Sequence, residues 1–165
     1  MMADTQSITI LPLTAEAFAD YGDVLNAKNA PDVMINQGLC GRHHDRAQMI
    51  CDGGRLGVSV FDAVPRDLPY QLDLMERHPL GSQCFMPMTE HPFLVIVADD
   101  DNGKPGRPKA FMVPPHTGVN IHRNVWHGVL TPLFSPGLFT VIDRVAGDGN
   151  NLEEHWMSPP YIITE

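Results

Sequence analysis

The chain has 165 residues, 43% of them apolar, and its 20 acidic and 11 basic side chains give a formal net charge of −9. This length suits one domain, and the apolar share excludes a disordered chain. The negative charge disfavours nucleic acid and membrane surfaces as partners, because both bind basic faces. No apolar run reaches the length of a membrane span, and three cysteines are too few for a disulfide framework. We therefore expect a cytoplasmic protein.

Fourteen glycines and fifteen prolines disfavour long helices and favour short strands joined by turns. The alternation in residues 7–13 predicts an edge strand, and a short helix follows, with Thr14 as its cap, Phe18 as its core anchor and Gly22 at its end. Strand patterns then recur about every ten residues. They cover residues 56–61, 70–78, 84–88, 93–98, 110–113, 119–122, 126–130 and 138–143. The short separations indicate antiparallel pairing in a sandwich or barrel.

No internal repeat or low-complexity tract divides the chain, so we expect a single domain over residues 1–165. Residues 1–55 form its N-terminal strand and helix segment, residues 56–146 its barrel core, and residues 147–165 its C-terminal tail. The polar loop 99–108 interrupts the core. The tail is polar and then rich in proline, which indicates a segment that wraps the surface or a partner subunit.

The first polar cluster ends the strand at residues 70–78. Glu76 and His78 lie on its apolar face, and Gln83 follows the turn after them. An acid and an imidazole on such a face are costly to bury unpaired, so a metal, a substrate or a hydrogen-bond network must compensate. The structural alternative is a salt-bridged strand end with Arg77 as the partner.

The second cluster is GVNIHRNVWH at residues 118–127. His122 and His127 are five residues apart, so an extended strand would place them on opposite faces unless a turn or bulge intervenes. His122 ends a predicted strand. A lone histidine is more often a structural residue, but polar neighbours such as Arg123 weaken that interpretation here.

Two further groups offer anion-binding or acid–base side chains. Asn36, Arg42 and His44 belong to one polar stretch, where His44 precedes an acid and forms either an oriented base or part of a surface loop. Arg144 follows the last strong strand. A guanidinium group there can hold a carboxylate through two hydrogen bonds, or can form a structural ion pair.

The order of these groups resembles the two motifs of cupin barrels, H-x-H-x(4)-E and then a glycine, a short spacer and a histidine. Glu76, His78 and Gln83 fall at the three positions of the first motif, and His122 falls at the histidine of the second, one residue later than in the usual spacing. Glu76 replaces a histidine and Gln83 replaces a glutamate. The resemblance implies an all-β fold, a cupin-like antiparallel β-barrel (double-stranded jelly roll) with one short N-terminal helix.

Longer strings are similar to the ureidoglycolate lyase family of the allantoin-degradation pathway. They are LPLTAEAFADYGDVL, INQGL, ERHPLGSQCFMPM, GVNIHRNVWH and VIDR. The resemblance implies a homodimer of cupin barrels that splits (S)-ureidoglycolate, a small-molecule substrate, into glyoxylate and urea. It also implies a divalent metal, nickel in this family.

The implied reaction needs a base at the substrate hydroxyl, an acid at the leaving nitrogen, a carboxylate clamp and contacts for the urea group, but no nucleophile. We expect four side chains to line the barrel floor and to hold a metal or bind the hydroxy-acid end: Glu76, His78, Gln83 and His122. Without a metal, Glu76 or a histidine must act as the base.

The remaining candidates are assigned to the two ends of the substrate. Arg144 is the preferred carboxylate clamp because it ends a strand that should line the barrel mouth, and Arg123 and Arg42 are its alternatives. His44 and Asn36 would contact the urea group, from the N-terminal segment or across the dimer.

Other functions on the same fold remain open. A non-catalytic cupin that binds a small molecule would release no glyoxylate from ureidoglycolate. A metal-dependent cupin oxygenase would consume oxygen, and an amidohydrolase would release ammonia instead of urea.

Overall fold

The computed structural model describes residues 6–165 and consists mostly of β-strands, as the glycine and proline content predicted. Residues 1–5, part of the predicted segment 1–55, lie outside the described residues. The helices are α1 (Ala15–Phe18) and the short 3-10 helix η1 (Asn36–Gly38). The strands are β1 (Ser7–Pro12), β2 (Gly22–Leu25), β3 (Val33–Ile35), β4 (Cys40–Arg42), β5 (Gly54–Asp62), β6 (Tyr70–Arg77), β7 (Gln83–Pro87), β8 (Phe93–Ala98), β9 (Asp100–Asp101), β10 (Lys104–Pro105), β11 (Lys109–Val113), β12 (Gly118–Ile121), β13 (Trp126–Gly128), β14 (Thr131–Pro132), β15 (Leu138–Gly147) and β16 (Glu153–Thr164).

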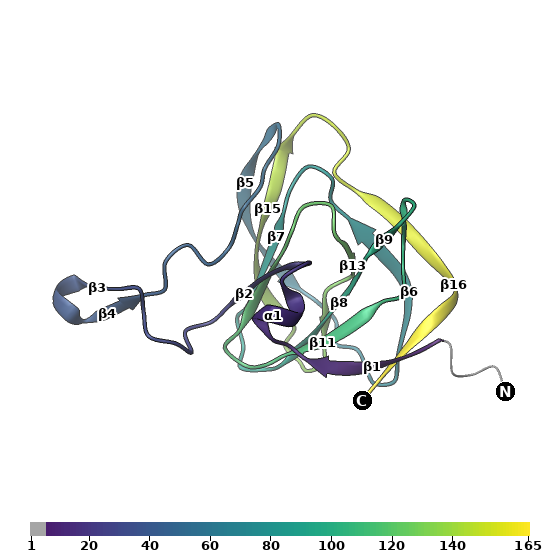
Figure 1. Ribbon diagram of the computed structural model, residues 1–165, viewed down its shortest axis with the longest axis horizontal. Helices are drawn as coiled ribbons and strands as arrows, with labels where there is room; N and C mark the ends of the chain where they lie inside the picture. Colours follow the sequence, from purple (N-terminus) through teal and green to yellow (C-terminus); the bar gives the residue numbers. More distant parts are fainter. Residues whose placement is uncertain (1–5) are drawn as a thin grey trace.

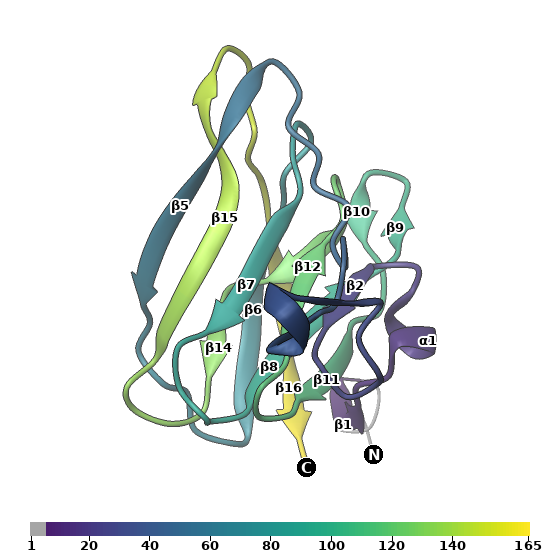
Figure 2. The same cartoon turned by 90° about the vertical axis from the view of Figure 1, so that its left-hand side faces the viewer.

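Two sheets make up the body of the molecule (Figures 1 and 2). The larger has seven strands in the order β11-β1-β16-β6-β13-β8-β14, and the smaller has five in the order β2-β12-β7-β15-β5. An additional pairing between β11 and β8 closes part of the larger sheet into a ring. The ring consists of β8, β11, β1, β16, β6 and β13. The predicted all-β, cupin-like barrel with one short α-helix is thus confirmed.

Two apolar cores fill this architecture. The ring core lies inside the ring and contains Ile8, Leu72, Met75, Leu94, Ile96, Ala98, Ala110, Trp126 and Ile163. The inter-sheet core joins the ring to the five-stranded sheet and contains Phe18, Tyr21, Phe85, Phe93, Val95, Val97, Phe111, Val113, Val119, Ile121, Phe139 and Val141. Because side chains alternate along a strand, β8 supplies both cores and is apolar at every position.

The predicted helix start is confirmed, although the helix is shorter than predicted. The Thr14 hydroxyl accepts a hydrogen bond from the backbone N–H of Ala17 at 3.0 Å, and Phe18 is fully buried. Gly22 begins β2 instead of ending the helix. A Cβ at Gly22 would lie 2.0 Å from the carbonyl oxygen of Asn120, so only glycine allows β2 to pair this closely with β12.

Two predictions about the ends of the chain were wrong. Residues 7–13 were predicted as an edge strand in antiparallel pairing, but β1 lies between β11 and β16 and pairs with both in parallel. These partners come from distant parts of the chain, so no short connection restricts the pairing. Most of the predicted surface tail is the strand β16, which completes the ring between β1 and β6. Its prolines 159 and 160 lie where the register with β6 shifts, a position that needs no ladder hydrogen bond.

The hairpin of β3 and β4, residues 33–42, extends away from both sheets (Figure 1). We call it the arm. Every residue of its two strands is exposed, including the apolar side chains Val33, Met34 and Ile35. Within residues 6–165, the helices are too short and too polar to cross a lipid bilayer.

Candidate functional site

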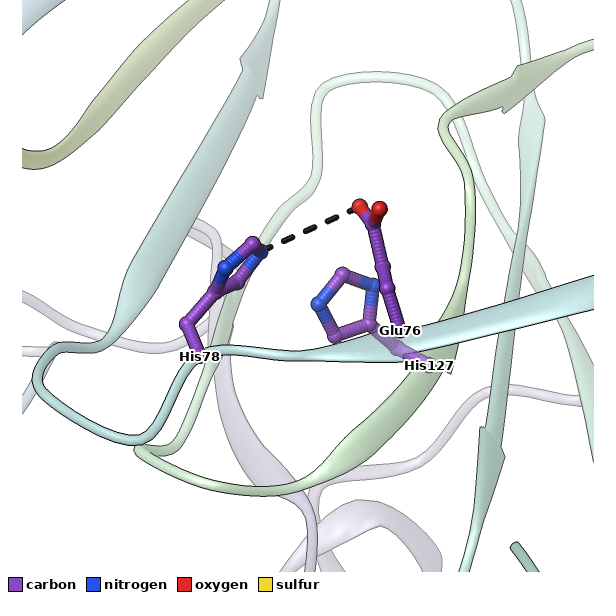
Figure 3. Close-up of side chains that lie close together, drawn as sticks. All are labelled: Glu76, His78 and His127. Carbon is purple, nitrogen blue, oxygen red and sulfur yellow. Dashed lines mark ion pairs between the residues drawn. The ribbon is translucent and has the colours of Figure 1, made fainter. Parts of the chain in front are cut away.

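Glu76, His78 and His127 gather between the two sheets (Figure 3). One ligand atom from each lies within 4.8 Å of those of the other two. The Nε2 atom of His78 is 3.8 Å from Oε1 of Glu76, and the centroids of the two imidazole rings are 5.1 Å apart. We call these three residues the inter-sheet cluster.

Strand register explains how the cluster forms. Glu76 on β6 and His127 on β13 are direct cross-strand partners, so their side chains share one face. His127 also pairs with Val97 of the inter-sheet core, which places that face between the sheets. His78 follows β6, and its carbonyl oxygen accepts a hydrogen bond from the backbone N–H of Asn124 at 2.9 Å. This bond ties the end of β6 to the turn that leads into β13.

Backbone carbonyl groups orient both imidazole rings. Nδ1 of His78 lies 2.8 Å from the carbonyl oxygen of Asn151, and Nδ1 of His127 lies 2.9 Å from that of Gly128. A carbonyl oxygen only accepts, so each Nδ1 carries the proton and each neutral ring keeps a lone pair on Nε2. Both Nε2 atoms are buried and have no hydrogen-bond partner. The cluster therefore offers two nitrogen lone pairs and a carboxylate to one point.

Burial shapes the electrostatics of the cluster. It lowers the pKa of His127 to about 3, with the nearby His78 adding to the shift and the Gly128 carbonyl opposing it. It raises the pKa of the Glu76 carboxyl, against an opposing effect of His78 and with a further increase from Glu154. His127 is therefore neutral at pH 7, as a metal-binding imidazole must be.

These residues fit a divalent metal ion. Two imidazole nitrogens and one carboxylate form a mixed set that suits nickel, manganese, iron or zinc. The orphaned Nε2 atoms supply the observation for the fit, because buried polar atoms without partners are rare in folded proteins. The second nitrogen of each ring is held by a backbone carbonyl, as is usual for histidine ligands.

Gln83 faces the same space from the opposite sheet. It begins β7 and pairs with Ile121 of the inter-sheet core, so the two side chains share a face. Its amide nitrogen donates a hydrogen bond to Oδ2 of Asp143 at 2.9 Å. The structure brings Glu76 and His78 together, and Gln83 lies on the face of β7 that borders the same side of the five-stranded sheet; the predicted roles of all three residues stay predictions.

His122 requires a correction, because the structure does not bring it into the cluster. Its Nε2 lies 3.1 Å from Oδ1 of Asp23. Asp23 is the cross-strand partner of Asn120, whose side chain points away from the inter-sheet core. His122, two residues after Asn120, continues on that outer face. The second imidazole of the cluster is His127.

The sequence analysis missed His127 as a site residue, although one signal was available. The spacing of five residues indicated that His122 and His127 face opposite sides. In the structure a turn at Arg123 and Asn124 does intervene between β12 and β13, so spacing alone does not fix the two faces, and of the two histidines only His127 faces inward. The pairing of β13 with β6 and β8 places His127 on the inward face, and this register could not be predicted from the spacing of the two histidines.

The predicted substrate-binding residues lie elsewhere. Arg144 donates hydrogen bonds from Nε to the Asp52 carbonyl at 2.8 Å and from Nη2 to the Asp148 carbonyl. Arg123 forms an ion pair with the Asp52 side chain. Asn36, Arg42 and His44 are exposed residues of the arm and of the segment after it. The structure does not bring these five residues into the inter-sheet cluster, and their roles toward a substrate stay predictions.

The fold and the cluster define a class: cupin-like barrels with a histidine and carboxylate set between two sheets. A family model described as ureidoglycolate lyase matches residues 5–164. The ureidoglycolate lyase of Rhodobacter capsulatus is 53% identical over 159 residues, covering 96% of this chain and 98% of that protein. Ureidoglycolate lyase 2 of Rhizobium meliloti is 50% identical, covering 94% and 96%. The ureidoglycolate lyase of Agrobacterium fabrum is 45% identical, covering 98% of each chain. The chain belongs to the ureidoglycolate lyase family.

Proposed function

We propose that this chain is a carbon–nitrogen lyase that splits (S)-ureidoglycolate into glyoxylate and urea. The observation that carries the proposal is the inter-sheet cluster, which combines a buried carboxylate with two oriented imidazoles in a chain that matches this family along its length. The substrate is a carbinolamide, whose central carbon bears a hydroxyl, a carboxylate and a urea nitrogen.

The reaction balances without water or a nucleophile. A base removes the hydroxyl proton, the C–O bond becomes the carbonyl of glyoxylate, and the electron pair of the C–N bond passes to nitrogen, which takes up a proton as urea leaves. We assign the base to Glu76 for the case in which no metal is bound, because its carboxylate lies beside both imidazole rings and accepts a proton. A well-placed general base contributes about 10²–10⁴-fold to such a step.

We propose that Glu76, His78 and His127 hold a divalent metal ion, nickel by family resemblance. When bound, such a cation acidifies a coordinated hydroxyl group and balances negative charge. The polarity of the site supports this assignment: the two Nε2 atoms and the carboxylate are all acceptors, whereas the substrate is an anion. Arg144 and Arg123, two of the candidate clamps, already bind groups of this chain.

We also propose a homodimer of the cytoplasm. On β5, an edge strand of the five-stranded sheet, Leu56, Val58 and Val60 are 40%, 72% and 63% exposed. An exposed apolar edge strand favours pairing with a second copy. The exposed arm is placed to reach a partner, so Asn36 and Arg42 become candidates for contacts across the dimer. The three free cysteines are compatible with a reducing compartment.

Incubation of the purified, nickel-loaded protein with (S)-ureidoglycolate tests the proposal, with glyoxylate, urea, ammonia and oxygen followed together. We expect equal amounts of glyoxylate and urea. Ammonia in place of urea would identify an amidohydrolase, oxygen consumption an oxygenase, and no turnover a binding protein. The mass of the native protein, measured by light scattering, tests the dimer.

A further inference from the structure

The side-chain amide of Gln83 has only one possible orientation. Its partner Asp143 is also its cross-strand neighbour, and Oδ2 of Asp143 lies 2.9 Å from the amide nitrogen of Gln83. A carboxylate accepts hydrogen bonds and donates none, so the NH₂ group of the amide must face Asp143. The amide oxygen therefore points away from Asp143.

This oxygen is unused within the described residues. Gln83 is 7% exposed, and its Oε1 atom is buried without a hydrogen-bond partner. Leaving an acceptor buried and unpaired destabilises a protein, so such an atom calls for a ligand. The side chain lies on the inter-sheet face of β7, and His127 lies on the inter-sheet face of β13. Gln83 and the inter-sheet cluster thus lie on the two faces that border the space between the sheets.

We propose that Oε1 of Gln83 accepts a hydrogen bond from an N–H group of the substrate's ureido end, and that Asp143 is the positioning residue that fixes the amide. This inference rests on the proposed function. The substrate's carboxylate offers no donor, and its one hydroxyl proton is the proton that the base removes, so the three N–H hydrogens of the ureido group are the donors left for Gln83. A fixed neutral acceptor therefore recognises the ureido group and distinguishes this substrate from 2-hydroxy acids that lack it.

Two unreactive ligands allow the binding of the ureido end and of the hydroxy-acid end to be measured separately. N-carbamoylglycine has the carboxylate and the ureido group but no hydroxyl, and glycolate has the carboxylate and the hydroxyl but no ureido group. We would measure the Kd of each by calorimetry on the nickel-loaded protein and on Gln83→Met, which keeps the length of the side chain without the amide. Gln71→Met is the matched control, since Gln71 is exposed on β6.

We expect Gln83→Met to weaken N-carbamoylglycine binding by roughly 10- to 100-fold, the loss expected when a buried donor is left unpaired. Glycolate and nickel should bind Gln83→Met as they bind the unmodified protein, and Gln71→Met should change nothing. Equal weakening of both ligands, or weaker nickel binding, would overturn the proposal and make Gln83 a metal ligand or a contact for the hydroxy-acid end. Failure of the unmodified protein to bind N-carbamoylglycine would also overturn it.

Two more variants test the role of Asp143 and protect the experiment against misfolding. In Asp143→Asn the partner side chain can donate as well as accept, so the Gln83 amide loses its single orientation. We expect a higher KM for ureidoglycolate with little change in kcat.

The double variant combines Gln83→Met with Asp143→Asn and removes the unpaired charge that Gln83→Met leaves. It should restore the melting temperature but not the binding of N-carbamoylglycine. An unchanged KM in Asp143→Asn would contradict the positioning role. If the protein binds N-carbamoylglycine as expected but releases no glyoxylate from ureidoglycolate, the result would contradict only the proposed function.

Discussion

Two regions of the molecule pair an imidazole with a carboxylate, and they treat the carboxylate in opposite ways. In the inter-sheet cluster, burial raises the pKa of Glu76. In the outer network of Asp23, Asn120 and His122, burial also acts to raise the pKa of Asp23, but hydrogen bonds from Asn120 and from the Gln48 backbone, together with the nearby His122, outweigh it and lower the pKa.

The difference lies in the donors that each carboxylate receives. Oδ2 of Asp23 accepts hydrogen bonds from Nδ2 of Asn120 at 3.0 Å and from the backbone N–H of Gln48 at 2.9 Å, and His122 lies beside Oδ1. Glu76 has His78 at 3.8 Å and sits among acceptors. The fold itself satisfies Asp23, whereas the charge of Glu76 calls for a cation from outside the chain. We therefore expect the Asp23 carboxylate to stabilise the fold and the Glu76 carboxylate to bind a cation.

Substitution of His127 and of His122 should show the largest difference between the two regions. We expect His127→Ala to lower kcat/KM for glyoxylate release by about 10²–10⁴-fold, because it removes a group that binds at the reacting centre. His122→Ala should change kcat/KM by less than about tenfold. Both variants would first be checked by circular dichroism. The reverse ranking would restore His122 as the second imidazole of the site.

Removal of the metal should show the second-largest difference, because only the inter-sheet cluster is proposed to hold a metal ion. A chelator should abolish glyoxylate release, and added nickel should restore it in the unmodified protein and in His122→Ala. Nickel at about 100 times its Kd should stabilise the folded protein by about 2.7 kcal/mol, because a ligand that binds only the folded state raises its stability. We expect this rise in melting temperature to be absent in His127→Ala. Full activity after exhaustive chelation would contradict the metal assignment.

Asp23→Asn should affect stability and not the chemistry. At pH 7 we expect a loss of about 1.5–3 kcal/mol in the free energy of unfolding, since hydrogen bonds to the ionised carboxylate are removed. The pKa of Asp23 is lowered in the folded state. Its stabilising effect is therefore complete above the unfolded pKa of about 3.9, and it is lost as the pH falls through the lower folded value.

Urea denaturation of Asp23→Asn and the unmodified protein at several pH values measures this effect. The difference in unfolding free energy should be constant near neutral pH and should shrink below about pH 4. A difference that grows on acidification would contradict the sign of the shift.

The smallest expected effect concerns Glu154, which lies opposite Glu76 on β16 and is exposed. Glu154→Gln removes a negative charge near the cluster without touching its ligand atoms. We expect nickel binding to weaken by about threefold or less, because water screens exposed charges. Calorimetric titration at low and high salt should show the effect fading as salt rises. A loss as large as that of a ligand variant would place Glu154 in the site itself.

Local sequence patterns predicted the features of the fold that depend on residues close together in the chain. Thr14 was recognised as a helix cap because its hydroxyl reaches a backbone N–H three residues away. Glu76 and His78 were placed on one side of the chain because side chains alternate along a strand. The apolar run at residues 93–98 was predicted as a strand, and the structure shows that two different cores bury it.

Features that depend on register between distant strands could not be predicted. His127 joins Glu76 only because β13 lies between β6 and β8. The proline-rich tail gave no strand signal, since proline disfavours a ladder, and its pairing with β6 depends on the register shift that accommodates residues 159 and 160. The hydrogen bonds of the Arg144 side chain to carbonyl groups of Asp52 and Gly53, more than ninety residues earlier, are likewise contacts between distant segments that its place after a strand did not indicate.

The parallel neighbours β1 and β16 come from opposite ends of the chain, and together they complete the ring. A nascent chain therefore cannot close the ring until residues 153–164 have left the ribosome. Until then β6 lacks one of its partners, and apolar side chains such as Ile8 and Leu72 wait for Ile163 to cover them. Contacts of such long sequence separation slow folding, so we expect the pairing of β16 with β1 and β6 to be a late step in the closure of the ring.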